Sequence, residues 1–135
     1  MILIVCVDDD YGMAFNHRRQ SSDRVVTSEI LRISAGKILW VAPYTASLFP
    51  EAENISVDDS FMDKAQCGDV CFVERIPVEP WLNKAEQIII FRWNRKYPFD
   101  VKFPYDLLKN QWVTEETKEF TGSSHDKITM EVYHL

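Results

Sequence analysis

Residues 87–93 read QIIIFRW and form the clearest buried strand in the sequence. Three consecutive isoleucines and a phenylalanine give an apolar run without alternation, which is typical of a strand covered on both faces of a parallel sheet. The opening residues 1–7, MILIVCV, are of the same kind and end abruptly at three aspartates. We therefore expect these two strands to lie side by side in one sheet.

Working outward from this pair, helical and strand patterns alternate along the chain. Residues 22–33 place apolar side chains at helical spacing after Ser22, a plausible N-cap, and residues 58–68 suggest a second helix that ends at Gly68. This alternation predicts an α/β protein whose sheet is mainly parallel, flanked by helices and closed by a C-terminal antiparallel hairpin. The expected sheet strands are residues 1–7, 37–42, 70–74 and 87–93, with the hairpin from about 112 to 134.

Length and composition indicate one packed domain over residues 1–135. Hydrophobic residues make up 46% of the chain and aromatic residues 13%, enough for a sizeable core. The apolar opening is too short for a membrane span and lacks the basic start of a signal peptide. We therefore expect a cytoplasmic protein without a membrane association.

The net charge of −6 is concentrated in the middle of the chain, where residues 41–90 carry three basic and nine acidic side chains. This argues against a broad nucleic-acid surface, which needs a cationic stripe. Cys6, Cys67 and Cys71 are predicted to be reduced, buried or half-buried thiols. Their spacing does not match a zinc or redox pair, and no metal site is expected.

Residues 83–104, NKAEQIIIFRWNRKYPFDVKFP, resemble a stretch of the dihydrofolate reductases. The shared pattern is Lys-Ala, a hydrophobic strand, a loop and an Asp-x-x-Phe-Pro signature, here Asp100, Phe103 and Pro104. Residues 106–135 are similar to the final hairpin of that family, with a Trp before one strand and a Phe at its end. The resemblance implies a dihydrofolate-reductase-like fold.

The N-terminal part is similar to the same family. There, a Gly-Met loop covers the active site and a carboxylate follows about a dozen residues later; here Gly12-Met13 precede Asp23. Residues 37–45, KILWVAPYT, resemble the second strand, which normally runs into Gly-Arg-x-Thr, of which Thr45 alone matches. The resemblance implies that Asp23 is the catalytic carboxylate, in an apolar pocket with a raised pKa, and that Thr45 contacts ligand. The competing interpretation makes Asp23 an N-terminal helix residue favoured by the macrodipole.

The departures from the family bear on the cofactor. Residues 57–73 resemble the helix and strand before the family's Gly-Gly cofactor loop, but Glu74-Arg75-Ile76-Pro77 stand in its place. A carboxylate where pyrophosphate should lie opposes phosphate binding. The chain is also shorter than the family by about twenty or more residues between Phe49 and Asn54. We therefore expect no cofactor, and in particular no NADPH bound in the usual way.

Cationic side chains gather in residues 12–24, which we predict to be a loop crossing the mouth of a cleft and ending at Asp23. Bidentate arginines bind phosphate or carboxylate, and neighbouring amides add hydrogen bonds. Alternatively, the arginines pair with residues 8–10. Arg92 precedes a second basic and aromatic stretch, 92–98, that either stacks on a nucleotide or packs under its own loop. The predicted ligand-binding residues are Asn16, Arg18, Arg19, Gln20, Arg24, Thr45 and Arg92; His125 and His134 are given no catalytic role.

The sequence thus favours a cytosolic domain that has lost hydride transfer and binds a small anionic or nucleotide-like ligand or a protein partner. Two other hypotheses stay open. One is an oxidoreductase with a non-standard nicotinamide site, and the other is a small acidic inhibitor or immunity-type protein. Whether the protein is an enzyme is not decided by these residues, although the replaced glycine pair argues against it.

Overall fold

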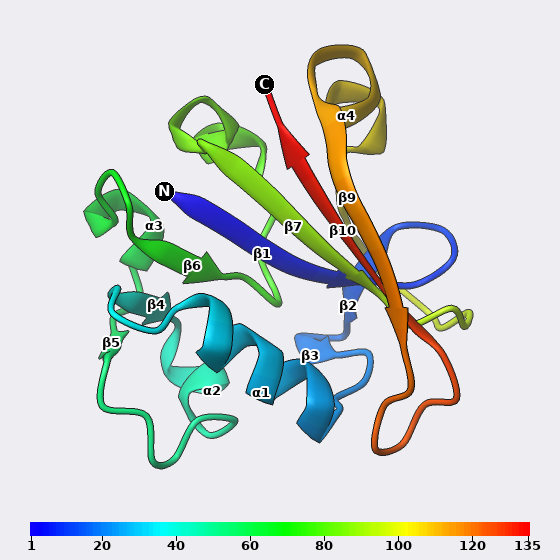
Figure 1. Ribbon diagram of the computed structural model, residues 1–135, viewed down its shortest axis with the longest axis horizontal. Coiled ribbons are helices and arrows are strands. Elements are labelled where there is room, and N and C mark those ends of the chain that lie inside the picture. Colours follow the sequence, from blue (N-terminus) through cyan, green and yellow to red (C-terminus); the bar gives the residue numbers. More distant parts are fainter.

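A seven-stranded mixed sheet forms the centre of the protein in the computed structural model, which describes residues 1–135 (Figure 1). Apolar runs make its central strands, and the charged and polar run of residues 113–120 lies at one edge. From one edge to the other the strands are β5 (Ile55–Val57), β4 (Leu39–Val41), β6 (Val70–Phe72), β1 (Ile2–Val7), β7 (Gln87–Arg92), β10 (Ile128–His134) and β9 (Val113–Phe120).

The predicted pairing of the first strand with residues 87–93 is confirmed. Strands β1 and β7 run parallel, with Leu3 opposite Ile88 and Val5 opposite Ile90. The pairs from β5 through β7 are all parallel, whereas β10 runs antiparallel to both β7 and β9. The mainly parallel α/β sheet with a closing C-terminal hairpin is therefore present.

Each face of the sheet covers its own core because successive side chains of a strand point to opposite faces. In β7, Ile88 and Ile90 belong to one core, and Ile89 and Phe91 to the other. Helix α1 (Arg24–Ile33) packs on the second face through buried Val26 and Ile30 (Figure 1). The alternation continues past the strand end, so Trp93 joins the face of Phe91.

Helix α1 begins one residue later than the sequence suggested. Its N-cap is Asp23, whose carboxylate accepts a hydrogen bond from the Val25 amide at 2.9 Å. Ser22 is exposed and does not cap the helix, so that expectation was wrong. The ionised side chain at the cap also interacts favourably with the positive end of the helix dipole.

Residues 12–19 are not the predicted loop but a β-hairpin. Strands β2 (Gly12–Phe15) and β3 (Arg18–Arg19) pair antiparallel, and β8 (Val101–Lys102) completes a three-stranded second sheet. Asn16 and His17 form the two-residue turn with φ of 52° and 62°, as a type I′ hairpin requires. Strand β2 also pairs with β8, almost ninety positions away, and local patterns do not reveal that contact.

The remaining helices are short. The helix predicted for residues 58–68 spans only Phe61–Lys64 (α3), because Ala65 is already extended. Helix α2 covers Pro43–Ala46, a 3₁₀ segment covers Glu79–Lys84, and α4 (Tyr105–Gln111) was not anticipated. None of these helices, nor α1, combines the length and apolarity needed to cross a bilayer.

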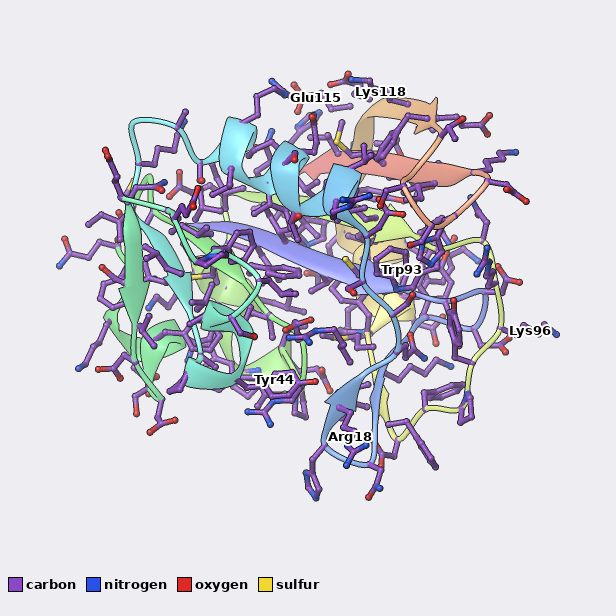
Figure 2. All side chains as sticks on the ribbon, turned by 90° about the horizontal axis from the view of Figure 1, so that it is seen from below. Arg18, Tyr44, Trp93, Lys96, Glu115 and Lys118 are labelled. Carbon is purple, nitrogen blue, oxygen red and sulfur yellow. The ribbon has the colours of Figure 1, made fainter.

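Strand β9 ends the sheet with an almost fully exposed row of residues. Glu115 and Lys118 project from this edge (Figure 2), and Glu116 and Glu119 add further charge. Charged side chains on an edge strand oppose pairing with the strands of other molecules. Strand β9 is therefore suited to remaining an unpaired, solvent-exposed edge of the sheet.

Candidate functional site

The polar side chains of interest gather where the parallel strands end. Ligands of open α/β sheets bind outside the carboxyl ends of the strands. Here β1 runs into Asp8, β6 is followed by Glu74, and β7 is followed by Trp93. Two further segments reach this edge, namely the N-terminus of α1 with Asp23 and the turn at residues 121–125.

Glu74 is held by the protein itself. Its carboxylate makes a two-pronged ion pair with Arg19, with Nε–Oε2 at 2.7 Å and Nη2–Oε1 at 3.0 Å. The hydroxyl of Thr45 donates to Oε1 at 2.8 Å. The Glu74 side chain is only 7% exposed, and its negative charge is compensated by Arg19. Thr45 and Arg19, both predicted to bind ligand, therefore meet a carboxylate of the chain itself.

A tyrosine separates two arginines beside this ion pair. The guanidinium groups of Arg19 and Arg75 lie 4.4 and 3.9 Å from the centre of the Tyr44 ring. The Tyr44 hydroxyl accepts a hydrogen bond from the Arg19 amide at 3.1 Å. In Figure 2 Tyr44 and Arg18 lie towards the same end of the molecule. These contacts fix the hairpin of β2 and β3 against α2 through a cation–π stack.

Asp23 is buried and accepts every hydrogen bond that its two oxygens can readily hold. Oδ1 accepts from the amides of Val25 and Ser123 at 2.9 and 3.0 Å. Oδ2 accepts from the Ser124 amide and hydroxyl at 2.9 and 3.2 Å, and lies 2.9 Å from Nδ1 of His125. Burial alone would raise the pKa of Asp23, but these donors lower it well below its usual range. The expectation of a raised pKa was therefore wrong.

The turn that supplies these donors has no room for a larger side chain at Gly122. A Cβ there would lie 2.3 Å from Oδ2 of Asp23. The glycine thus permits the close approach of the turn to the carboxylate. Asp23 acts as a clamp between the start of α1 and residues 122–125, in addition to any role toward a ligand.

The pH dependence of stability should report this clamp. An aspartate whose pKa is depressed on folding stabilises the protein above its unfolded pKa of about 3.9, and that contribution is lost as the pH falls toward the folded pKa. We expect the free energy of unfolding to fall by about 1 kcal/mol per pH unit below about pH 4 through Asp23 alone. Urea unfolding at pH 6, 4 and 3 measures it, and the Asp23→Asn variant should lack this component; an equal decline in both proteins would contradict the assignment.

His125 connects Asp23 to Ser21 through its two ring nitrogens. Its Nε2 lies 2.9 Å from Oγ of Ser21, while its Nδ1 faces Asp23. His125 is 4% exposed, and its ring stacks on that of Trp93, with centroids 4.6 Å apart. The sequence interpretation gave His125 no role, since about a hundred residues separate it from both partners and no spacing signals the contact.

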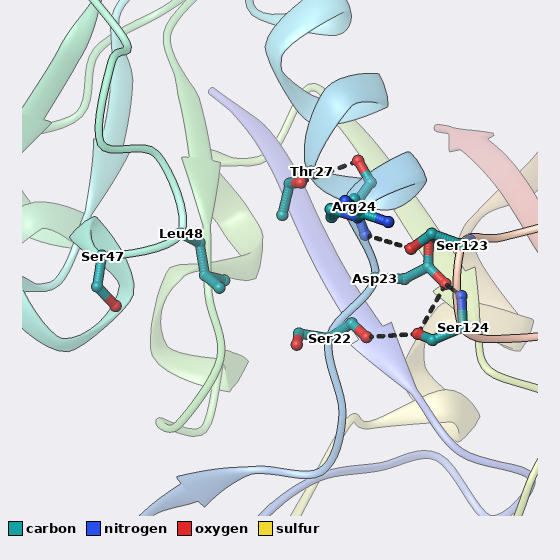
Figure 3. Close-up of a pocket in the computed structure, with 8 residues that line it drawn as sticks. All are labelled: Ser22, Asp23, Arg24, Thr27, Ser47, Leu48, Ser123 and Ser124. Carbon is teal, nitrogen blue, oxygen red and sulfur yellow. Dashed lines mark hydrogen bonds between the residues drawn. The ribbon is translucent and has the colours of Figure 1, made fainter.

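Open space is distributed unevenly around these groups. Two cavities of about 10 Å³ each lie at the strand ends, next to Cys6, Glu74 and Trp93. A larger groove, of about 380 Å³, is bordered by the start of α1, by residues 47–48 and by the turn at 123–124 (Figure 3). We call this groove the hydroxyl groove, and its lining residues are Ser22, Asp23, Arg24, Thr27, Ser47, Leu48, Ser123 and Ser124.

The predicted ligand-binding residues do not form one site. Arg24 lines the hydroxyl groove, whereas Arg18 and Asn16 lie exposed on the hairpin of β2 and β3. Arg92 points to the opposite face of the sheet, where its Nε pairs with Glu131 at 2.7 Å and its guanidinium lies over the ring of Tyr11.

The alternative pairing of the arginines with residues 8–10 does not occur. Asp8 is fully buried and accepts from the amides of Gly12 and Tyr97 at 2.8 and 3.2 Å. Nε2 of Gln20 donates to it at 3.2 Å. Asp8 therefore organises the turn after β1 and the loop after β7. Within that loop, Trp93 is buried while Lys96 extends outward (Figure 2).

The cysteines are unpaired, and their environments differ. Burial raises the pKa of the Cys71 thiol to about 12, and burial together with the Glu74 carboxylate raises the pKa of Cys6. Cys67 is exposed, contrary to the expectation that all three are covered. No three His, Cys, Asp or Glu side chains are grouped as metal ligands would be.

Comparison with solved structures identifies the class of fold. Dihydrofolate reductase from Enterococcus faecalis, complexed with NADP(H) and RAB-propyl, superposes with a TM-score of 0.70, covering 98% of this chain and 94% of that chain. The sequence identity is 9%, so the likeness concerns the fold alone. The chain has a dihydrofolate-reductase-like fold, as the sequence motifs indicated.

Sequence comparisons give a narrower result. No protein-family model matches the chain. A segment of 86 residues, 62% of the chain, is 34% identical to a polypeptide of the type 2 DNA topoisomerase 6 of Pyrococcus horikoshii. The match spans only 15% of the length of that polypeptide.

Proposed function

We propose that this protein is a ligand-binding domain of dihydrofolate-reductase-like fold that does not transfer hydride, and that it binds a small anionic or nucleotide-like ligand in the hydroxyl groove. The observation that carries the first part is the Arg19–Glu74–Thr45 cluster at the strand ends. The second part rests on the size and lining of the groove.

The strand ends offer no space for a nicotinamide and a pterin side by side. The two cavities there measure about 10 Å³ each, the size of a single water molecule. Glu74 adds a carboxylate where the reductases present backbone to a pyrophosphate, and Arg19 is already neutralised by it. Opening this region would expose an ion pair whose partners are both largely buried. These features argue against the reductase hypothesis with a displaced cofactor.

The hydroxyl groove has the dimensions of a small-ligand site. Its volume of about 380 Å³ falls in the range of about 300–1,000 Å³ that such sites occupy. Five hydroxyl-bearing residues and one arginine line it (Figure 3), and Leu48 supplies its apolar wall. Arg24 has no acidic partner, so its guanidinium is available to a phosphate or carboxylate. The Asp23 charge is turned inward onto its own donors.

Calorimetric titration tests this proposal. Wild-type protein is titrated with inorganic phosphate, adenosine monophosphate and NADPH, and the Arg24→Ala variant is titrated with the same compounds. A hydrogen bond to a charged group is worth about 1.5–3 kcal/mol, so the variant should bind its ligand roughly ten- to a hundred-fold more weakly.

Lys37→Ala is the matched control, because Lys37 is exposed after α1 and makes no side-chain ion pair. It removes the same charge and should leave the affinity unchanged. Equal affinity of wild type and Arg24→Ala, or the absence of binding for all three compounds, would exclude the groove as the anion site.

A further inference from the structure

We infer that Ser21 and His125 form a nucleophilic site that cleaves short-chain carboxylic esters, with Asp23 as its positioning residue. This activity goes beyond the proposed anion binding and does not depend on Arg24. It rests on a continuous chain of hydrogen bonds from a hydroxyl through an imidazole to a carboxylate.

The hydrogen-bond partners determine which atom carries the proton in each of these hydrogen bonds. Asp23 is an ionised acceptor because backbone amides hold both of its oxygens. The nitrogen that faces it, Nδ1 of His125, therefore carries the proton. In the neutral ring Nε2 then bears the lone pair and accepts from Oγ of Ser21 at 2.9 Å. Ser124 shares the Asp23 side of the ring, with its Oγ 3.2 Å from Nδ1.

The surroundings hold the base in place and leave the nucleophile accessible. Stacking on buried Trp93 and the contact with Asp23 restrict the His125 ring to one orientation. Ser21, in contrast, is partly exposed between β3 and α1. A shielded base beside a reachable hydroxyl is the arrangement by which a serine is activated in acyl transfer.

Two backbone amides at the nucleophile are free to stabilise a developing oxyanion. The backbone amides of Ser21 and Ser22 donate to no acceptor in the protein. Each additional amide directed at the oxyanion lowers the barrier of acyl transfer by about 3 kcal/mol. The amide of the nucleophile and that of the next residue are therefore available for this purpose.

The reaction balances without a cofactor. Oγ of Ser21 attacks the ester carbonyl carbon while Nε2 of His125 takes the hydroxyl proton. The tetrahedral adduct then expels the alcohol, to which His125 returns the proton, and acetyl-Ser21 remains. Water attacks this ester with His125 as base, the bond between carbonyl carbon and Oγ breaks, and Ser21 regains its proton. The products are a carboxylic acid and an alcohol.

The neighbouring space restricts the acyl group. Both cavities next to Ser21 measure about 10 Å³, which leaves room for a methyl-sized acyl substituent and no more. The alcohol part can extend over Ser22, which lines one of these cavities and the hydroxyl groove. Acetyl esters are therefore the class of substrate that the site favours.

Hydrolysis of p-nitrophenyl acetate tests the inference. The folded 135-residue chain should release p-nitrophenol faster than the same chain unfolded in urea, and an acid quench followed by peptide mass mapping should place an acetyl group on Ser21. Ser21→Ala should abolish both signals. His125→Asn should slow release by about 10²–10⁴-fold, the usual contribution of a general base. Asp23→Asn should lose more of the rate than Asp23→Glu, which keeps a carboxylate at this position.

Ser28→Ala and His134→Asn are the matched controls, since both residues are exposed and neither belongs to the hydrogen-bond network of Ser21, His125 and Asp23. They should leave the rate unchanged. Circular dichroism shows which variants are folded, and if His125→Asn is not, Ser21→Ala decides alone because it removes one partly exposed hydroxyl. The inference is overturned if wild type and Ser21→Ala release p-nitrophenol equally, if the acetyl group lies elsewhere, or if folded His125→Asn keeps the wild-type rate. Equal losses of rate in Asp23→Asn and Asp23→Glu would contradict the positioning role of Asp23.

Discussion

Replacing Asp23 with alanine should lower the free energy of unfolding by about 4 kcal/mol. The substitution leaves the amides of Val25, Ser123 and Ser124 without their acceptor, together with Nδ1 of His125. Nδ1 of His125 is the buried donor among them and costs about 1–3 kcal/mol when unsatisfied, the part-buried amides add to this cost, and the lost helix cap adds about 1 kcal/mol. Urea unfolding at pH 7, followed by circular dichroism, measures the change.

Asp126→Ala is the control for this prediction. Asp126 directly follows this turn but is exposed and forms no side-chain hydrogen bond or ion pair. Its removal should change stability by about 0.5 kcal/mol or less. A loss below about 1 kcal/mol in Asp23→Ala would mean that water replaces the carboxylate and that the clamp between α1 and residues 122–125 is not a stabilising element.

Replacing Arg19 with alanine should cost about 3 kcal/mol for a different reason. The substitution removes both donors of the two-pronged ion pair and leaves Glu74, with a side chain only 7% exposed, facing Thr45 alone. Breaking a buried pair by deleting one partner is strongly destabilising, because the remaining charge is not compensated. The stack on Tyr44 is lost as well. Thermal and urea unfolding give the size of the effect.

Arg18→Ala is the neighbouring control, because Arg18 is exposed and forms no ion pair. It should shift stability by about 0.5 kcal/mol or less. A double variant, Arg19→Met with Glu74→Leu, should recover most of the loss, since a buried pair replaced by apolar residues of similar size is often neutral. If Arg19→Ala and Arg18→Ala behave alike, the ion pair has no net stabilising value.

The residues of the site show which inferences a sequence supports. Asp23, Arg19 and Thr45 were each named from the sequence, and the structure places all three at the strand ends or the adjoining helix. Their partners were not foreseen. Glu74 was recognised only as an obstacle to phosphate, whereas it is the anion that Arg19 binds. His125 gave no signal, since its contacts depend on bringing the final turn against the start of α1.

Arg92 shows a limit of a different kind. It was grouped with Trp93 because the two are adjacent in a basic and aromatic stretch. Adjacent residues of a strand point to opposite faces, however, and Arg92 lies with Tyr11 and Glu131 while Trp93 lies with His125. The two-residue repeat of a strand predicts that Arg92 and Trp93 point to opposite faces. The sequence alone was therefore enough to avoid grouping them.

The sequence by itself determined the central sheet, because uninterrupted apolar runs in residues 1–7 and 87–93 can be stable only when both faces are covered. It also determined α1 through its helical apolar spacing. Tertiary structure alone decided the second sheet, the closure of the strand ends by Arg19 and Glu74, and the alignment of Ser21, His125 and Asp23. Those features join segments that are about 55 to 105 residues apart in the sequence, and local periodicity carries no information about contacts at that distance.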